Sequence, residues 1–105
     1  MPTSLADALR ILKDDEPELR RRGVTHAAVF GSVARGEASE ASDVDILIDL
    51  DPERRIDLFD YVNIKLHIAA LFGVESLDGP VDVVNRKTLK PLLRQEILGE
   101  AVDAF

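Results

Sequence analysis

Cysteine and tryptophan are both absent from the 105 residues of the chain. Without cysteine the protein can form neither a disulfide nor a thiolate metal site, and this composition fits a reducing compartment. The longest nearly uncharged run covers residues 68–74, which is far too short for a membrane span. Residues 1–4 show no basic or apolar segment typical of a signal peptide. We therefore expect a cytoplasmic protein that does not associate with membranes.

Basic residues are scarce: 13 Lys and Arg stand against 20 Asp and Glu, giving a formal net charge of −7. A general nucleic-acid binder needs a basic surface, so no direct contact with nucleic acid is expected. The acids are concentrated in residues 37–60, which hold nine Asp or Glu and two Arg. Such a block can be a solvated face, a cation site or a docking surface for a basic partner. The charges alone do not decide among these.

The chain is 46% hydrophobic and 31% charged, which predicts one globular domain over residues 1–105 with a sizeable core. The spacing of apolar residues and the turn signals predict the following elements: a helix from residue 5, a short helical turn opened by Pro17, strand 24–30, short helix 32–35, strand 43–50, helix 56–72, strand 81–84 and a last helix capped by Thr88. This order indicates an α/β (α+β) fold, with helices packed on a mixed β-sheet.

Two carboxylates lie at the start of the strand expected over residues 43–50. Asp43 and Asp45 are two residues apart, so their side chains point the same way and repel each other unless a cation lies between them. Asp82, from the third strand, can add another carboxylate or can merely lie at a strand edge. Carboxylates without Cys or His suit Mg²⁺ or Mn²⁺. Three of them suit two ions about 3.5–4 Å apart, an arrangement that serves phosphoryl transfer.

Gly31 and Ser32 stand between the first strand and the short helix. Backbone N–H groups and a hydroxyl at such a position can bind an anion, and glycine lets a phosphate come close. Arg35 can reach the phosphates, or it can pair with Glu37 or a backbone carbonyl. Ser42 either fixes the following loop or contacts the nucleotide. A phosphate cradle beside a cation site is typical of nucleoside triphosphate binding.

The complete pattern resembles a known superfamily. Gly31-Ser32, ten residues, Asp43-x-Asp45 and a later Asp82 are similar to the nucleotidyltransferases that include DNA polymerase beta and the aminoglycoside nucleotidyltransferases. The fuller run over residues 31–36 and 42–45 most resembles the shortest members, the minimal nucleotidyltransferase (MNT) family. The similarity extends over almost the whole chain.

This resemblance implies roles for the matching residues. Gly31 and Ser32 are expected to hold the triphosphate of ATP, with Arg35 and Ser42 as further candidates for contacts with the nucleotide. The three aspartates, Asp43, Asp45 and Asp82, are expected to be the metal ligands and the catalytic residues. Of these, the first two would bind two Mg²⁺ ions, and the third would bind one ion and favour deprotonation of the attacking hydroxyl. Attack on the α-phosphorus would release pyrophosphate.

The resemblance also implies a partner. MNT proteins are typically encoded beside HEPN-domain ribonucleases and act as antitoxins, and some transfer AMP from ATP to a tyrosine of the toxin. Larger relatives append domains that recognise the acceptor, and 105 residues leave no room for one. We therefore expect an adenylyltransferase antitoxin whose acceptor lies on a HEPN ribonuclease toxin. The alternatives are an antitoxin that acts by occlusion alone and a small-molecule nucleotidyltransferase working as a homodimer.

Three consecutive arginines, Arg20 to Arg22, precede Gly23. Cations near the end of a helix, followed by glycine, are typical of a helix C-terminus; a phosphate site is the alternative interpretation. Structural positions in the core or on the surface are expected for the remaining candidates, which are His26, His67 and Tyr61.

Overall fold

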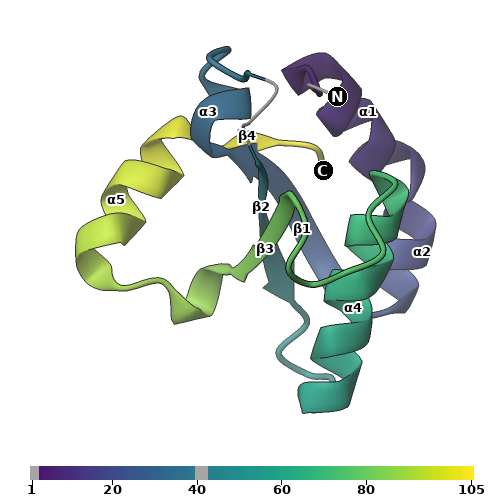
Figure 1. Cartoon of the computed structure of the whole chain (residues 1–105). Coiled ribbons are helices and arrows are strands. Elements are labelled where there is room, and N and C mark those ends of the chain that lie inside the picture. The colour runs from purple at the N-terminus through teal and green to yellow at the C-terminus, as the bar shows by residue number, and fades with distance from the viewer. Residues whose placement is uncertain (1–2, 40–42) are drawn as a thin grey trace.

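Residues 3–39 and 43–105 are described by a computed structural model of the chain. A four-stranded sheet with the order β3-β2-β1-β4 forms its centre (Figure 1). The elements, in chain order, are α1 (Leu5–Asp14), α2 (Glu16–Arg21), β1 (Val24–Phe30), α3 (Gly31–Ala34), β2 (Val44–Leu50), α4 (Leu58–Leu71), β3 (Val81–Asn85), the 3-10 helix η1 (Arg86–Thr88), α5 (Pro91–Glu100) and β4 (Val102–Asp103). The predicted fold class is confirmed.

The sheet is mixed in direction. β1 pairs antiparallel with β2 and with β4, whereas β2 and β3 run parallel. A parallel pair needs a long crossover connection, and α4 supplies it between β2 and β3. None of the helices in the described part of the chain has the length and apolarity that a membrane span requires.

Side chains along β2 alternate between two buried apolar clusters. Ile46 and Ile48 of β2 belong to the larger buried cluster, against which α1, α2 and α4 pack. Leu47 points the other way and joins a smaller cluster with Ala28 and Phe30 of β1, which α5 covers in part. Figure 1 shows this division, with three helices on one side of the sheet and α5 on the other. Because α5 covers only part of its face, polar groups can remain accessible there.

The long helix α4 begins at Leu58, two residues later than predicted. Asp57 is its N-cap: the Asp57 side chain accepts the Asp60 N–H at 2.8 Å, and the Asp60 side chain accepts the Asp57 N–H at 3.2 Å. This reciprocal capping box fixes where the helix starts. Ile56 therefore lies before the helix and packs against the core as a partly buried residue.

The C-terminal segment differs most from the prediction. Thr88 does not cap the last helix, because it ends the 3-10 helix η1; α5 begins at Pro91, a residue suited to the first helical position. In the sequence, Val102 continues the helical spacing of apolar residues that begins at Leu92, so it was expected to belong to that helix. It lies in β4, paired with Val29 on the free edge of β1. An edge strand leaves backbone groups unpaired, and the chain end satisfies part of that edge.

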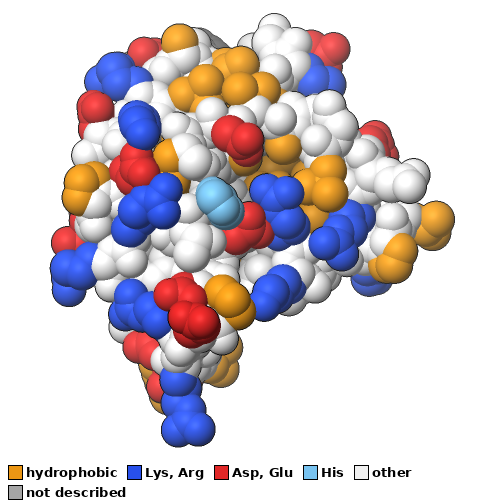
Figure 2. All heavy atoms as spheres, turned by 180° about the vertical axis from the view of Figure 1, so that it is seen from behind, with side chains coloured by type: hydrophobic (Ala, Val, Ile, Leu, Met, Phe, Trp, Pro, Cys, Tyr) orange, Lys and Arg blue, Asp and Glu red, His pale blue; other side chains and the backbone are white. Residues whose placement is uncertain are grey.

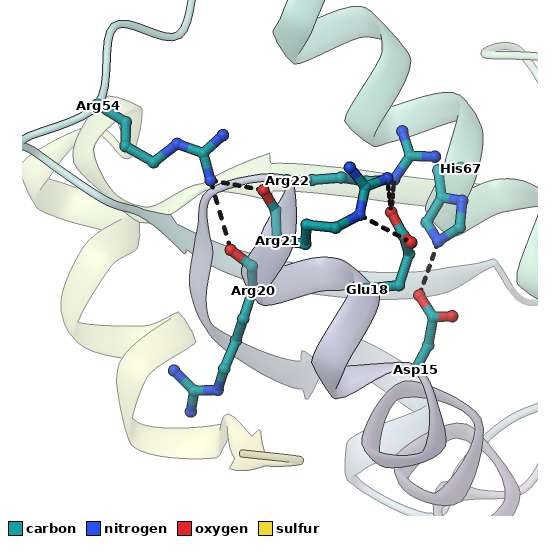
Figure 3. Close-up of polar contacts among 7 residues, drawn as sticks. All are labelled: Asp15, Glu18, Arg20, Arg21, Arg22, Arg54 and His67. Atoms are coloured by element: carbon teal, nitrogen blue, oxygen red, sulfur yellow. Dashed lines mark hydrogen bonds and ion pairs between the residues drawn. The ribbon is translucent and has the colours of Figure 1, made fainter.

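The arginines before Gly23 do end a helix, as predicted. Gly23 has φ +101°, the left-handed conformation common just after helices. Arg54 reaches across from the loop after β2, and its Nη1 donates to the Arg21 carbonyl at 2.6 Å (Figure 3). The two histidines are structural or surface residues: His26 is exposed, and His67 contacts Asp15 at 2.7 Å.

Candidate active site

Two of the predicted acids are direct neighbours on adjacent strands. Asp45 of β2 is the direct partner of Asp82 of β3 in the parallel register, and of Phe30 of β1 on its other side. Partner residues on neighbouring strands project from the same face. Both carboxylates therefore lie on the face that α5 covers only in part.

Asp43 precedes β2 by one residue and is exposed. It is therefore the last residue of the connecting loop and not a strand residue. Asp82 is also exposed, whereas Asp45 is half-buried. No three Asp, Glu or His side chains within residues 3–39 and 43–105 gather closely enough to hold a metal ion. Asp43 and Asp82 are both exposed, and exposed side chains exchange rotamers readily.

The electrostatics of Asp45 show how many acids surround it. The pKa of Asp45 is raised to about 6, chiefly by burial and then by the negative charges of Asp82, Asp43 and Glu100. Arg35 acts in the opposite direction. Three carboxylates and one guanidinium thus act on Asp45 at this end of the sheet. A donor set of this kind lacks positive charge and suits a hard divalent cation.

Gly31 brings the short helix α3 against this acidic cluster. It follows β1, is buried and has φ +73°. A Cβ atom at this position would collide with Oδ2 of Asp45. Glycine is therefore required for two reasons, the left-handed backbone and the close approach of a carboxylate. Ser32 follows as the second residue of α3 and is partly exposed.

Glu100, at the end of α5, is a site residue that the sequence did not indicate. Its Oε1 accepts the Gly31 N–H at 3.0 Å, and its Oε2 pairs with Nη1 of Arg35 at 2.8 Å. The hydrogen bond from Arg35, together with the smaller contribution of the Gly31 N–H, holds the pKa of Glu100 below its usual range. Its place in the predicted last helix could have indicated a role, because a negative charge in the last turn of a helix is unfavourable unless a cation or a hydrogen-bond donor compensates it.

Arg35 ends α3 and is held by two acids. Besides Glu100, its Nε donates to Glu37 at 3.0 Å. The pairing with Glu37 was one of the alternatives expected from the sequence. Ser42, the other candidate for nucleotide contact, lies outside the described residues. Tyr61 is partly buried against the core, as expected, and burial raises its pKa, with a smaller effect from Asp82.

Comparison with known proteins identifies the family. Residues 7–104 match the nucleotidyltransferase domain family. The chain is 38% identical over 100 residues to the protein adenylyltransferase MntA of Thermococcus cleftensis, with 94% of each chain covered. It also superposes with a TM-score of 0.71, at 39% identity and 95% coverage of each chain, on a solved structure described as a minimal nucleotidyltransferase. The chain belongs to the nucleotidyltransferase family, in which it is a minimal nucleotidyltransferase and an enzyme.

One further structure shares the fold at low identity. It contains the tri-AMPylated Shewanella oneidensis HEPN toxin in complex with an MNT antitoxin. The TM-score is 0.59 at 15% identity, and the match covers 92% of this chain and 71% of that chain. At this identity the likeness establishes the architecture alone.

Proposed function

We propose that this enzyme transfers AMP from ATP to a tyrosine hydroxyl of a HEPN ribonuclease toxin and acts as the antitoxin of that ribonuclease. One observation carries the proposal: Asp45 lies across from Asp82 and directly against Gly31. This proximity of two acids to Gly31 supports the interpretation that the acids and the candidate phosphate cradle form one site. The names of the relatives, a protein adenylyltransferase and an antitoxin in complex with an AMPylated HEPN toxin, support the choice of reaction and partner.

In this proposal the aspartates hold two Mg²⁺ ions, with Mn²⁺ as a possible substitute. Asp43 and Asp45 would contact both ions, and Asp82 would contact one. When bound, the ions would supply the positive charge that the carboxylate cluster lacks and would neutralise the triphosphate. The position of Asp82 at the open edge of this cluster suits it to accept the proton of the incoming hydroxyl.

The bond changes involve the α-phosphate of ATP. The hydroxyl oxygen of the acceptor forms a bond to the α-phosphorus, and the bond from that phosphorus to the bridging oxygen breaks. Pyrophosphate leaves with the electron pair, and the acceptor carries AMP. Gly31, Ser32 and Arg35 would orient the phosphates for this displacement. Because Glu100 occupies the Gly31 N–H, a phosphate oxygen that uses this donor must displace the carboxylate.

Two features of the surface suit a protein acceptor. Leu92 and Leu93 of α5 are 93% and 50% exposed, and α5 lies on the same side of the sheet as Asp45 and Asp82 (Figure 1). Large exposed apolar side chains are common where a partner docks. The acidic residues between positions 37 and 60 can also attract a basic ribonuclease.

A transfer assay tests the proposal. The purified chain is incubated with Mg²⁺, a HEPN ribonuclease and ATP labelled at the α-phosphate. We expect label on the ribonuclease with the native chain and with Asp78→Asn, which changes an exposed acid in the turn before β3 that is not among the proposed metal ligands. We expect none with Asp45→Asn. Inhibition of the ribonuclease by the native chain without any label would show that occlusion is sufficient and would refute the catalytic proposal.

A further inference from the structure

A cavity of about 250 Å³ lies at the opposite end of the sheet from the candidate active site. Its walls come from the end of α2, the loop after β2 and the start of α4, and its polar lining residues are Arg21, Arg22, Arg54, Arg55, Asp60 and Asn63. The loop is fixed to the start of β1, because the Asp51 N–H donates to the Gly23 carbonyl at 2.8 Å. A strand rises about 3.3 Å per residue, so the end of β2 at Leu50 lies roughly 17 Å from Asp45.

Two of the arginines share one carboxylate. Nε of Arg21 donates to Oε1 of Glu18 at 3.1 Å, and Nε of Arg22 donates to Oε2 at 2.8 Å (Figure 3). One negative charge is therefore divided between two guanidiniums. This arrangement orients both side chains beside the cavity and leaves one positive charge uncompensated.

The other two arginines have no acidic partner within residues 3–39 and 43–105. Nη1 of Arg54 donates to the carbonyl oxygens of Arg20 and Arg21, at 3.5 and 2.6 Å. It thereby compensates the negative end of α2, which would otherwise repel an anion. Arg55 makes no hydrogen bond and no ion pair with any residue in the described ranges, and it is exposed. Its guanidinium is free to contact a ligand.

The charges around the cavity do not balance. Four arginines line it, and the carboxylates among its lining residues and their direct partners are those of Asp60, Asp57 and Glu18. The excess is one positive charge, in a chain whose net charge is −7. The cavity also adjoins the first turn of α4, the positive end of a 14-residue helix. A local excess of cations in an acidic protein indicates a site for an anion.

We propose that this cavity binds a small phosphate-bearing anion, either free pyrophosphate or the phosphate tail of a nucleotide. Arginine forks match phosphate oxygens in two-point contacts, and the cavity volume admits a few phosphate groups. A nucleic acid is disfavoured, because basic and acidic side chains are interspersed over the face seen in Figure 2, with no continuous basic track along which a backbone could lie. This site is additional to the proposed transfer reaction and does not depend on it.

Binding of pyrophosphate in the presence of EDTA, followed by isothermal titration calorimetry at low salt, tests the inference. We expect saturable binding that Arg55→Gln weakens about tenfold, the value of one charge-assisted hydrogen bond. Arg55 makes no contact that the fold requires, so this variant is expected to keep the native circular dichroism spectrum. The control is Arg10→Gln, an exposed arginine of α1 outside the cavity, and its affinity should equal that of the native chain. Absence of saturable binding, or equal affinity for Arg55→Gln and native protein, would overturn the proposal.

Competition separates the two sources of phosphate. If the phosphate tail of a nucleotide is the ligand, ATP displaces pyrophosphate from the native chain and from the Ser32→Ala variant alike. If free pyrophosphate is the ligand, ATP competes at least tenfold less well. Either result supports the site, provided that Arg55→Gln weakens the binding of pyrophosphate. An RNA oligonucleotide that binds more tightly than pyrophosphate and loses this binding in Arg55→Gln would contradict the assignment to a small anion.

Discussion

The carboxylate of Asp45 occupies the space that a Cβ atom on Gly31 would need. Gly31 directly follows β1 as the first residue of α3, and Asp45 lies in the neighbouring strand β2, so the sheet itself holds the acid against the start of α3. This contact joins the two halves of the proposed site. A substitution at Gly31 would therefore displace the Asp45 carboxylate without changing any charge.

Gly31→Ala should reduce stability and abolish transfer of AMP. Gly36→Ala is a matched control, because Gly36 has the same φ of +73° and nothing lies within 4 Å of its added Cβ. We expect the control to lose about 1 kcal/mol through backbone strain and to retain activity. Gly31→Ala should lose more, because Asp45 must also move. Urea denaturation and the transfer assay would check this, and equal losses with full activity in both variants would be incompatible with the account.

The stability of the native chain should depend on the protonation of Asp45. Its pKa in the folded protein is about 6, against an ordinary value of 3.8, so the folded state binds the proton more tightly than the unfolded state. The free energy of unfolding therefore falls as the pH rises from about 4 to 6. Asp45→Asn should be more stable than the native chain at pH 7.5, on the order of 1 kcal/mol after allowance for solvent screening of this half-buried group.

The difference in stability between Asp45→Asn and the native chain should vanish at low pH. Below about pH 4 the native carboxyl is protonated in both states, so Asp45→Asn and the native chain should unfold at similar urea concentrations. Asp78→Asn, at an exposed turn, should show no such pH-dependent gain. A gain for Asp45→Asn that persisted at pH 3.5 would mean that packing, and not charge, is responsible.

Glu100→Gln should lower the pKa of Asp45. The charge of Glu100 is one of the causes that raise this pKa, and a glutamine keeps an oxygen that can accept the Gly31 N–H. Glu37→Gln is the control: it removes the other carboxylate bound to Arg35, and Glu37 is not among the groups that shift Asp45. Carbon-detected NMR titration of the aspartate carboxyls measures both. A larger shift in Glu37→Gln than in Glu100→Gln would contradict the assigned electrostatics.

Association with a HEPN ribonuclease should slow as salt is added. The acidic residues between positions 37 and 60 would attract a basic partner over long range, and salt screens such attraction. Glu53→Lys, inside this stretch, should lower the association rate constant more than Glu75→Lys, an exposed acid outside it. Stopped-flow measurements at two ionic strengths provide the comparison. A rate that does not change with salt would exclude steering by this surface.

Local patterns were sufficient to predict much of the fold and the main elements of the site. In β2 the alternation of apolar and polar residues fixed both the strand and its faces, which places Asp45 opposite the main core. The spacing of Gly31 and Asp45 indicated a shared site, although the sequence suggested a phosphate at the glycine and the structure shows that the carboxylate itself comes close.

The remaining features depend on contacts between distant segments. Val102 continues an apolar stripe in the sequence, and only the free edge of β1 makes it a strand residue. Glu100 is 69 residues from Gly31 and 65 from Arg35, so no local spacing relates them. Arg54 likewise reaches α2 from 33 residues away. Such contacts arise from how the elements pack, which periodicity and turn signals do not encode.

The central claim, that this enzyme silences a HEPN ribonuclease by adenylylation, is tested most directly by mass spectrometry of the ribonuclease after co-expression. One culture carries the native chain and the other carries Asp43→Ala. The account predicts AMP on a tyrosine of the ribonuclease in the first culture, no modification in the second, and loss of toxicity in the first alone. Equal suppression of toxicity by both chains, with no AMP on the ribonuclease in either culture, would contradict it.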